Sequence, residues 1–126
     1  MMGINAKILV IDDEEDLREN LKYILKMKGY EVALAEDGVQ GLKKLESYVP
    51  DLIILDLNMP NMGGLELIKN IKALPGYKFV PILTLTTESD ASKRDEGKRL
   101  GAAGWLVKPI SGADLLKVLK QLLPQP

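Results

Sequence analysis

Five short apolar runs, separated by segments long enough to form helices, constrain the fold of this chain more than any other feature. The runs lie near residues 7–11, 31–35, 52–55, 81–85 and 104–107. Runs of this length that are apolar on both faces are typical of strands buried in a parallel sheet. Their alternation with helical segments predicts an α/β fold built around a parallel sheet.

The first and last helical segments have clear amphipathic patterns, whereas the fourth does not. Apolar residues recur at helical spacing in the first segment before a stop at Gly29: Leu17, Leu21, Ile24 and Leu25. The last segment follows a candidate N-cap, Ser111, and carries a leucine stripe: Leu115, Leu116, Leu119, Leu122 and Leu123. Between Ser89 and Leu100 charged residues surround an interior Gly97, so we expect this helix to be the least anchored.

The length and composition favour a single soluble domain. The 126 residues are enough to bury one core, which we place at about residues 6–123. With 17 basic and 18 acidic residues the net charge is −1, so no overall field attracts nucleic acid. No apolar stretch approaches the roughly 18 residues that span a bilayer, and residues 1–7 lack the apolar core of a signal peptide. We therefore expect a cytoplasmic monomer, residues 1–126, that binds neither nucleic acid nor membrane directly.

Cysteine and histidine are both absent from the chain. This excludes disulfides, thiol nucleophiles, histidine general bases and the usual zinc sites. Carboxylate, hydroxyl and lysine side chains remain for any chemistry. Oxygen ligands without nitrogen or sulfur favour a hard cation, and Mg²⁺ before Ca²⁺.

Acidic residues end two of the predicted strands. Asp12 and Asp13 follow the first apolar run, and Asp56 closes the third. The carboxyl ends of parallel strands form the edge at which open α/β sheets bind ligands. Three carboxylates at that edge would repel one another unless a cation lies between them, so the sequence predicts a metal site. Glu14, Glu15 and Asp16 extend the acidic run, and the last two are adequately explained by the positive end of the following helix.

A hydroxyl and a lysine reach the same edge from the last two strands. Thr86 ends the fourth run and Lys108 follows the fifth. Alone, each has an ordinary explanation, as a strand residue or a solvated charge. Together with the acids they compose a site for phosphoryl transfer onto Asp56, in which a metal and Lys108 neutralise the phosphoryl oxygens.

At this point the chain resembles the receiver domain of two-component response regulators, most closely the stand-alone CheY-like proteins of chemotaxis. The resemblance covers essentially the whole chain and rests on four ordered motifs: Asp12-Asp13, the segment DLIILDLNMP at residues 51–60, Thr86, and Lys108-Pro109. It implies a flavodoxin-like, doubly wound five-stranded sheet of order 2-1-3-4-5 with five helices. That strand order follows from the resemblance and not from the spacing of the runs.

The resemblance also implies how Asp56 is phosphorylated. A phosphohistidine on a histidine kinase of the CheA type would be the donor, and the chain would be a switch that only phosphorylates and dephosphorylates itself, not an enzyme acting on other substrates. Asp13, Asp56 and the carbonyl of Asn58 would hold Mg²⁺, with Asp12 acting mainly through a metal-bound water.

The resemblance further implies a route for the signal. Thr86 would turn toward the phosphoryl group, and Trp105 would move into the space it leaves, although the only tryptophan of a small domain is more often a core residue. Family members signal through the face of the fourth helix, fifth strand and fifth helix. The expected target is a flagellar motor switch protein.

Several positions depart from the common family pattern. Thr87 stands where a smaller residue is frequent and is expected to affect access to the phosphate, Ile110 replaces a frequent phenylalanine, and Trp105 replaces a tyrosine or phenylalanine. By resemblance, Asn58, Thr87 and Glu88 flank the phosphate. Asn58 and Glu88 match chemotaxis-type members, which implies a short-lived phosphorylated state.

Three alternatives stay open at this stage. A haloacid dehalogenase-type phosphatase also uses Asp, Mg²⁺ and Lys, but needs a second acid where this chain has Asn58. A flavodoxin-like cofactor protein needs a phosphate loop where residues 12–16 are acidic. The nearer alternative is a receiver module of a larger regulator, or a phosphate sink or relay. We favour a free-standing protein, because no linker follows the last predicted helix.

Overall fold

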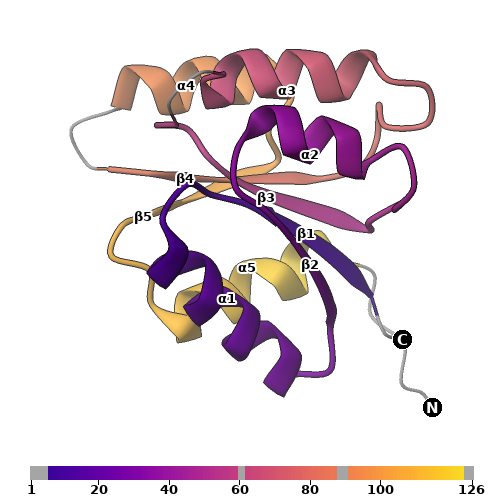
Figure 1. Cartoon of the computed structure of the whole chain (residues 1–126). Helices are drawn as coiled ribbons and strands as arrows, with labels where there is room; N and C mark the ends of the chain where they lie inside the picture. Colours follow the sequence, from indigo (N-terminus) through magenta and orange to yellow (C-terminus); the bar gives the residue numbers. More distant parts are fainter. Residues whose placement is uncertain (1–5, 60–61, 88–90, 124–126) are drawn as a thin grey trace.

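Five parallel strands alternate with five helices in the computed structural model, which describes residues 6–59, 62–87 and 91–123. The strands are β1 (Lys7–Ile11), β2 (Glu31–Ala35), β3 (Leu52–Asp56), β4 (Ile82–Thr86) and β5 (Gly104–Val107). The helices are α1 (Glu15–Met27), α2 (Gly38–Lys44), α3 (Gly64–Ala73), α4 (Ala91–Arg99) and α5 (Gly112–Leu122). The strand order is β2-β1-β3-β4-β5, which confirms the order implied by the family resemblance (Figure 1).

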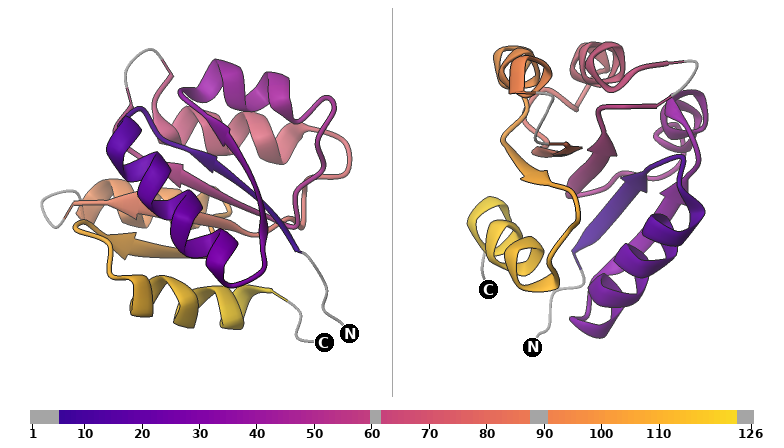
Figure 2. Two further views of the ribbon diagram at one scale, coloured as in Figure 1. Left: turned by 60° about the horizontal axis from the view of Figure 1, so that its bottom comes forward. Right: turned by 90° about the vertical axis from the view of Figure 1, so that its left-hand side faces the viewer.

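The sheet forms the middle of three layers. Helices α1 and α5 cover one face, and α2, α3 and α4 cover the other (Figures 1 and 2). Because successive strand residues point to opposite faces, Leu9 and Ile11 join the core under α2 and α3, whereas Ile8 and Val10 join the core under α1 and α5. This double burial explains why the strands are apolar on both faces.

The predicted elements agree closely with the observed ones. The strand expected at residues 81–85 begins and ends one residue later, and the strand at 52–55 extends to include Asp56. Gly29 follows α1 with a φ of +93°, a conformation that glycine adopts without strain. The hydroxyl of Ser111 accepts a hydrogen bond from the backbone N–H of Asp114 at 3.3 Å, which confirms the predicted N-cap of α5. None of the helices in the described ranges is long and apolar enough to cross a membrane.

Helix α4 is weakly embedded, as its sequence predicts. Among its residues Ala91–Arg99 only Gly97 is buried, and the helix presents charged side chains along most of its length. Helices α1 and α5, in contrast, bury leucines in the core. The fold therefore holds α4 with fewer apolar side chains than α1 or α5, so that less hydrophobic burial anchors it.

Candidate functional site

The register of the sheet brings three carboxylates to one edge. Ile11 pairs with Leu55, so the residues that follow, Asp12 and Asp56, lie level with each other on adjacent strands. Oxygen atoms of Asp12, Asp13 and Asp56 lie within 4.8 Å of one another. Asp12 and Asp56 are buried, whereas Asp13 is exposed. The predicted acidic cluster is therefore present, with one side open to solvent.

Lys108 is the cation that faces this cluster. It follows β5, and its backbone N–H donates to the carbonyl of Thr86 at 2.8 Å, which fixes it beside the end of β4. Its ammonium donates to Asp56 Oδ2 at 2.8 Å and to Glu14 Oε1 at 3.2 Å, and lies 4.0 Å from Asp12 Oδ2. Burial alone would lower the pKa of Lys108, but the hydrogen bond and charge of Asp56, with help from Asp12 and Glu14, raise it above its usual value. Lys108 therefore stays charged.

The surroundings of Asp12 disfavour its charged form. Its Oδ1 accepts from the backbone N–H of Glu14 at 2.8 Å, but its buried Oδ2 has no hydrogen-bond partner among the described residues. Burial raises the pKa of Asp12 to about 6, and the charges of Asp56 and Asp13 add to this effect. A buried oxygen without a donor, beside two further carboxylates, fits a site for a hard divalent cation.

Asn58 links the acidic cluster to helix α4. Its backbone N–H donates to Asp56 Oδ1 at 2.9 Å, which holds the Asp56 carboxylate in one orientation. Its side-chain Oδ1 accepts from Lys93 Nζ at 2.8 Å. Asn58 therefore lies beside Asp56 and also contacts α4.

The predicted threonine lies at the same edge but uses its hydroxyl elsewhere. Thr86 is fully buried at the end of β4, and its Oγ1 donates to the carbonyl of Thr87 at 3.3 Å. Thr87 itself is half-buried. Glu88 lies outside the described residues.

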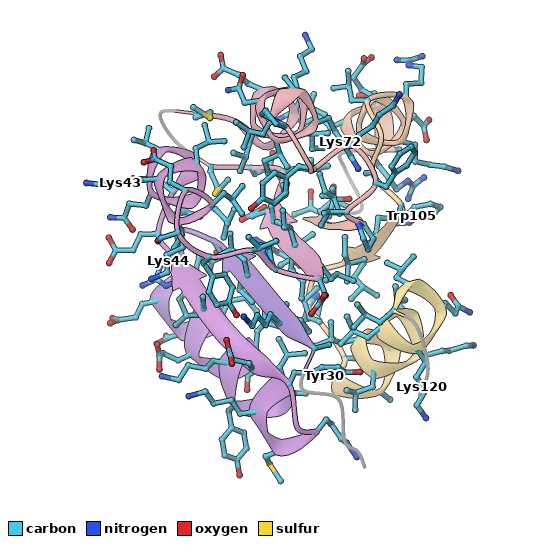
Figure 3. The ribbon with its side chains drawn as sticks, turned by 90° about the vertical axis from the view of Figure 1, so that its right-hand side faces the viewer. Tyr30, Lys43, Lys44, Lys72, Trp105 and Lys120 are labelled. Atoms are coloured by element: carbon cyan, nitrogen blue, oxygen red, sulfur yellow. The ribbon has the colours of Figure 1, made fainter. Side chains whose placement is uncertain are left out.

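Trp105 is not a core residue. The residue is 36% exposed, and it lies on the edge strand β5 between α4 and α5 (Figure 3). The Arg94 guanidinium lies 5.1 Å and the Lys98 ammonium 4.9 Å from the centre of its ring. These cation–π contacts join β5 to α4 at the surface.

Several contacts at the site were not predicted from the sequence. Glu14 pairs with Lys108, and Lys93 reaches Asn58 from α4. Arg18 is buried and donates to the carbonyl of Asp12 at 2.8 Å; its place on the apolar side of α1 was a detectable signal. Gly64 approaches Asp56 so closely that a Cβ would lie 2.7 Å from the Asp56 carbonyl oxygen.

Comparison with known protein families identifies the family to which this chain belongs. The model of the response regulator receiver domain matches residues 8–120. This chain belongs to the response regulator receiver family. Membership places it among the signalling switches of two-component systems and decides against the phosphatase and flavodoxin alternatives that the sequence left open.

Relatives of this receiver domain include longer regulators. It is 38% identical over 120 residues to the alkaline phosphatase synthesis transcriptional regulatory protein PhoP of Bacillus subtilis, covering 95% of this chain and 49% of PhoP. It is also 38% identical to the response regulator MprA of Mycobacterium ulcerans, covering 95% of this chain and 51% of MprA. The chain thus spans about half the length of these regulators.

Solved structures of similar proteins share the fold throughout. The chemotaxis response regulator CheY4 of Vibrio cholerae is 45% identical, with a TM-score of 0.90 over 95% of this chain and 100% of CheY4. The receiver domain of the sensor histidine kinase PA1611 from Pseudomonas aeruginosa is 27% identical, with a TM-score of 0.86 over 94% of this chain and 98% of that domain. That structure holds a magnesium ion coordinated in its active-site cleft.

Proposed function

We propose that this receiver domain is a phosphorylation switch in which Asp56 accepts a phosphoryl group from a phosphohistidine of a histidine kinase. One observation carries the proposal: the buried Asp56 carboxylate is bonded by Lys108 at Oδ2 and by the Asn58 N–H at Oδ1, inside a cluster of three acids. A carboxylate that is oriented from both sides is a prepared nucleophile, because attack then needs no reorientation.

The transfer exchanges one bond for another. An Asp56 oxygen forms a bond to phosphorus while the phosphorus–nitrogen bond of the donor breaks, and the departing imidazole keeps the electron pair and takes up a proton. The reacting carboxylate needs no general base, which agrees with a chain that lacks histidine and cysteine. Lys108 neutralises part of the charge on the phosphoryl oxygens. Hydrolysis later breaks the acyl phosphate bond as water attacks phosphorus.

The same residues fit a bound Mg²⁺. Asp13, Asp56 and the carbonyl of Asn58 would hold the ion, and Asp12, whose buried Oδ2 has no hydrogen-bond partner in the described structure, would act through a metal-bound water. When bound, the ion supplies positive charge to the phosphoryl oxygens. The magnesium in the PA1611 receiver supports this assignment.

The phosphoryl group would bias two states of the domain through Thr86 and Trp105. The hydroxyl of Thr86 makes a long hydrogen bond to Thr87 and can exchange it for a phosphoryl oxygen. Trp105 is partly exposed and contacts α4, so a change in this region alters its surroundings. Trp105 fluorescence is therefore the readout of the switch.

Acetyl phosphate with Mg²⁺ tests the central step. Intact mass should increase by one phosphoryl group on the wild-type chain, not on Asp56→Asn and not in EDTA. No mass gain on the wild type would overturn the proposal. Because Asn58 and Glu88 match chemotaxis-type members, we expect rapid decay after the donor is removed, and a phosphoryl lifetime of many hours would contradict this.

We assign the domain to a chemotaxis pathway, with a kinase of the CheA type as donor and a flagellar motor switch protein as target. The 45% identity to CheY4, over the full length of CheY4, supports this assignment. The 38% identity to PhoP and MprA supports the second candidate, a receiver module of a larger transcriptional regulator.

Phosphotransfer separates these two candidates. Purified, autophosphorylated CheA-type kinase should transfer its phosphoryl group to this chain within seconds, and a sensor kinase that serves a transcriptional regulator should do so far more slowly. The reverse preference would favour the larger regulator. Capture of the motor switch protein by the beryllofluoride-treated chain, but not by Asp56→Asn, would identify the target.

A further inference from the structure

Lys93 connects helix α4 to the phosphoryl site in a way that the proposed reaction does not use. It lies in the first turn of α4, and its ammonium donates to Asn58 Oδ1 at 2.8 Å. The backbone N–H of the same Asn58 donates to Asp56 Oδ1 at 2.9 Å. The nucleophile and helix α4 are therefore joined through a single residue, across 35 positions of sequence between Asn58 and Lys93.

The partner of Lys93 is neutral, and this limits how strongly it holds the lysine. An ammonium has three N–H donors, and an amide oxygen carries no net charge. Lys108, in contrast, binds the carboxylates of Asp56 and Glu14. The hydrogen bond from Lys93 to Asn58 has only one charged partner, whereas a phosphoryl oxygen is itself negatively charged. A phosphoryl group beside Asn58 would therefore attract the Lys93 ammonium more strongly than the amide does.

Charge at the site also favours a further cation. The carboxylates of Asp12, Asp13, Glu14 and Asp56 face the ammonium of Lys108 and the proposed Mg²⁺, and a phosphoryl group adds further negative charge. The side chain of Lys93 is exposed and flexible, so its ammonium can leave Asn58 without unpacking the core.

We propose that Lys93 is a second lysine ligand of the phosphoryl group on Asp56, and that its transfer from Asn58 to a phosphoryl oxygen draws the first turn of α4 toward the site. The inference rests on the proposed phosphorylation of Asp56. It assigns to α4 a direct electrostatic connection to the phosphoryl group, separate from the turn of Thr86.

The movement would be reported at Trp105. Arg94 follows Lys93 in the same helical turn, and its guanidinium lies 5.1 Å from the Trp105 ring. Only Gly97 of α4 is buried, so the helix can shift without removing large side chains from the core. Trp105 borders α4 at the edge of the sheet, where such a shift changes its contacts (Figure 3).

Beryllofluoride with Mg²⁺, which mimics a phosphoryl group on a carboxylate, tests this inference. Calorimetry gives its affinity independently of Trp105, and fluorescence gives the response of the indole. Lys93→Met should weaken beryllofluoride binding roughly tenfold, as expected for loss of one charge-assisted hydrogen bond at a partly exposed site, and should reduce the fluorescence change. Lys93→Arg should retain most of both. Lys117→Met removes the same charge from an exposed position on α5 and should leave both unchanged.

The outcomes separate this inference from the proposed function. Wild-type affinity and a full fluorescence change in Lys93→Met would overturn the role of Lys93 while phosphorylation of Asp56 stands. Equal weakening in Lys93→Met and Lys117→Met would also overturn it, because the effect would then be one of overall charge. A wild-type chain that neither binds beryllofluoride nor gains mass with acetyl phosphate would refute the proposed function and this inference together. Thermal unfolding of each variant verifies that the fold is intact.

Discussion

Helices α1 and α4 border the same acidic site but are attached to the protein in opposite ways. Helix α1 buries Leu21 and Leu25 in the core, and its Arg18 donates to the backbone of Asp12. Helix α4 buries only Gly97 among its residues and reaches the site through the long side chain of Lys93. The α1 side of the site is therefore anchored in the core, whereas the α4 side can move when a ligand binds.

The largest expected contrast is in stability. Leu25→Ala removes fully buried atoms from beneath α1 and should lower the free energy of unfolding by about 3 kcal/mol. Lys98→Ala, at an exposed position of α4, should lower it by less than about 0.5 kcal/mol. Urea unfolding measures both. Similar losses in the two variants would show that α4 is as firmly held as α1.

On the α1 side of the site, the buried charge of Asp12 lowers the stability of the folded protein, and Asp12→Asn should remove this effect. The pKa of Asp12 is about 6 in the folded protein, well above its ordinary value of 3.8. The folded state therefore binds this proton more tightly than the unfolded state does, and the stability gained from that proton is lost as the pH rises from about 4 through 6. In EDTA at pH 8 the variant should therefore be more stable than the wild type, by on the order of 2 kcal/mol. Thermal and urea unfolding give the difference.

Two controls test the cause of that gain. The advantage of Asp12→Asn should fall to about half as the pH is lowered from 8 to 5 and approach zero only near pH 4, where the unfolded wild-type chain is protonated at Asp12 as well. Saturating Mg²⁺ should stabilise the wild type more than the variant, because the variant lacks one acidic group of the site. A stability difference that is the same at pH 5 and pH 8 would mean that the charge of Asp12 is not its source.

Gly97→Ala should stabilise helix α4 and so reduce the difference in stability between α4 and α1. A Cβ at this position would lie 3.6 Å from Ile68 Cδ1, an ordinary contact, and alanine favours a helix over glycine by about 1 kcal/mol. We expect a gain in stability of roughly 0.5–1 kcal/mol and slower amide hydrogen exchange in α4. Unchanged exchange in α4 would contradict the view that the helix is limited by weak anchoring.

The smallest expected effect concerns the surface contact between α4 and β5. Arg94→Met removes the guanidinium from the Trp105 ring and should change stability by about 0.5 kcal/mol or less while shifting the Trp105 emission. Arg99→Met is the matched control, since Arg99 pairs with Glu96 on the same helix. An equal emission shift in both variants would argue against a specific contact.

The sequence predicted those parts of the molecule that depend on local pattern. Strand positions follow from apolar runs, and the meeting of Asp12 with Asp56 follows from each residue ending a parallel strand. The order of the strands is not contained in such runs and came from the family resemblance. Contacts made by long charged side chains, such as Lys93 to Asn58, were missed because they depend on how a helix is turned in the folded chain.

The close approach of Gly64 to Asp56 restricts how this site can vary in evolution. Any side chain at residue 64 would bring its Cβ within 2.7 Å of the Asp56 carbonyl oxygen and 2.5 Å of Leu57 Cα, so α3 begins directly against the backbone that follows β3. An insertion or a larger residue at this junction would displace the backbone of Asp56. Diversity among related switches is therefore expected in the exposed residues of α4 rather than at the start of α3.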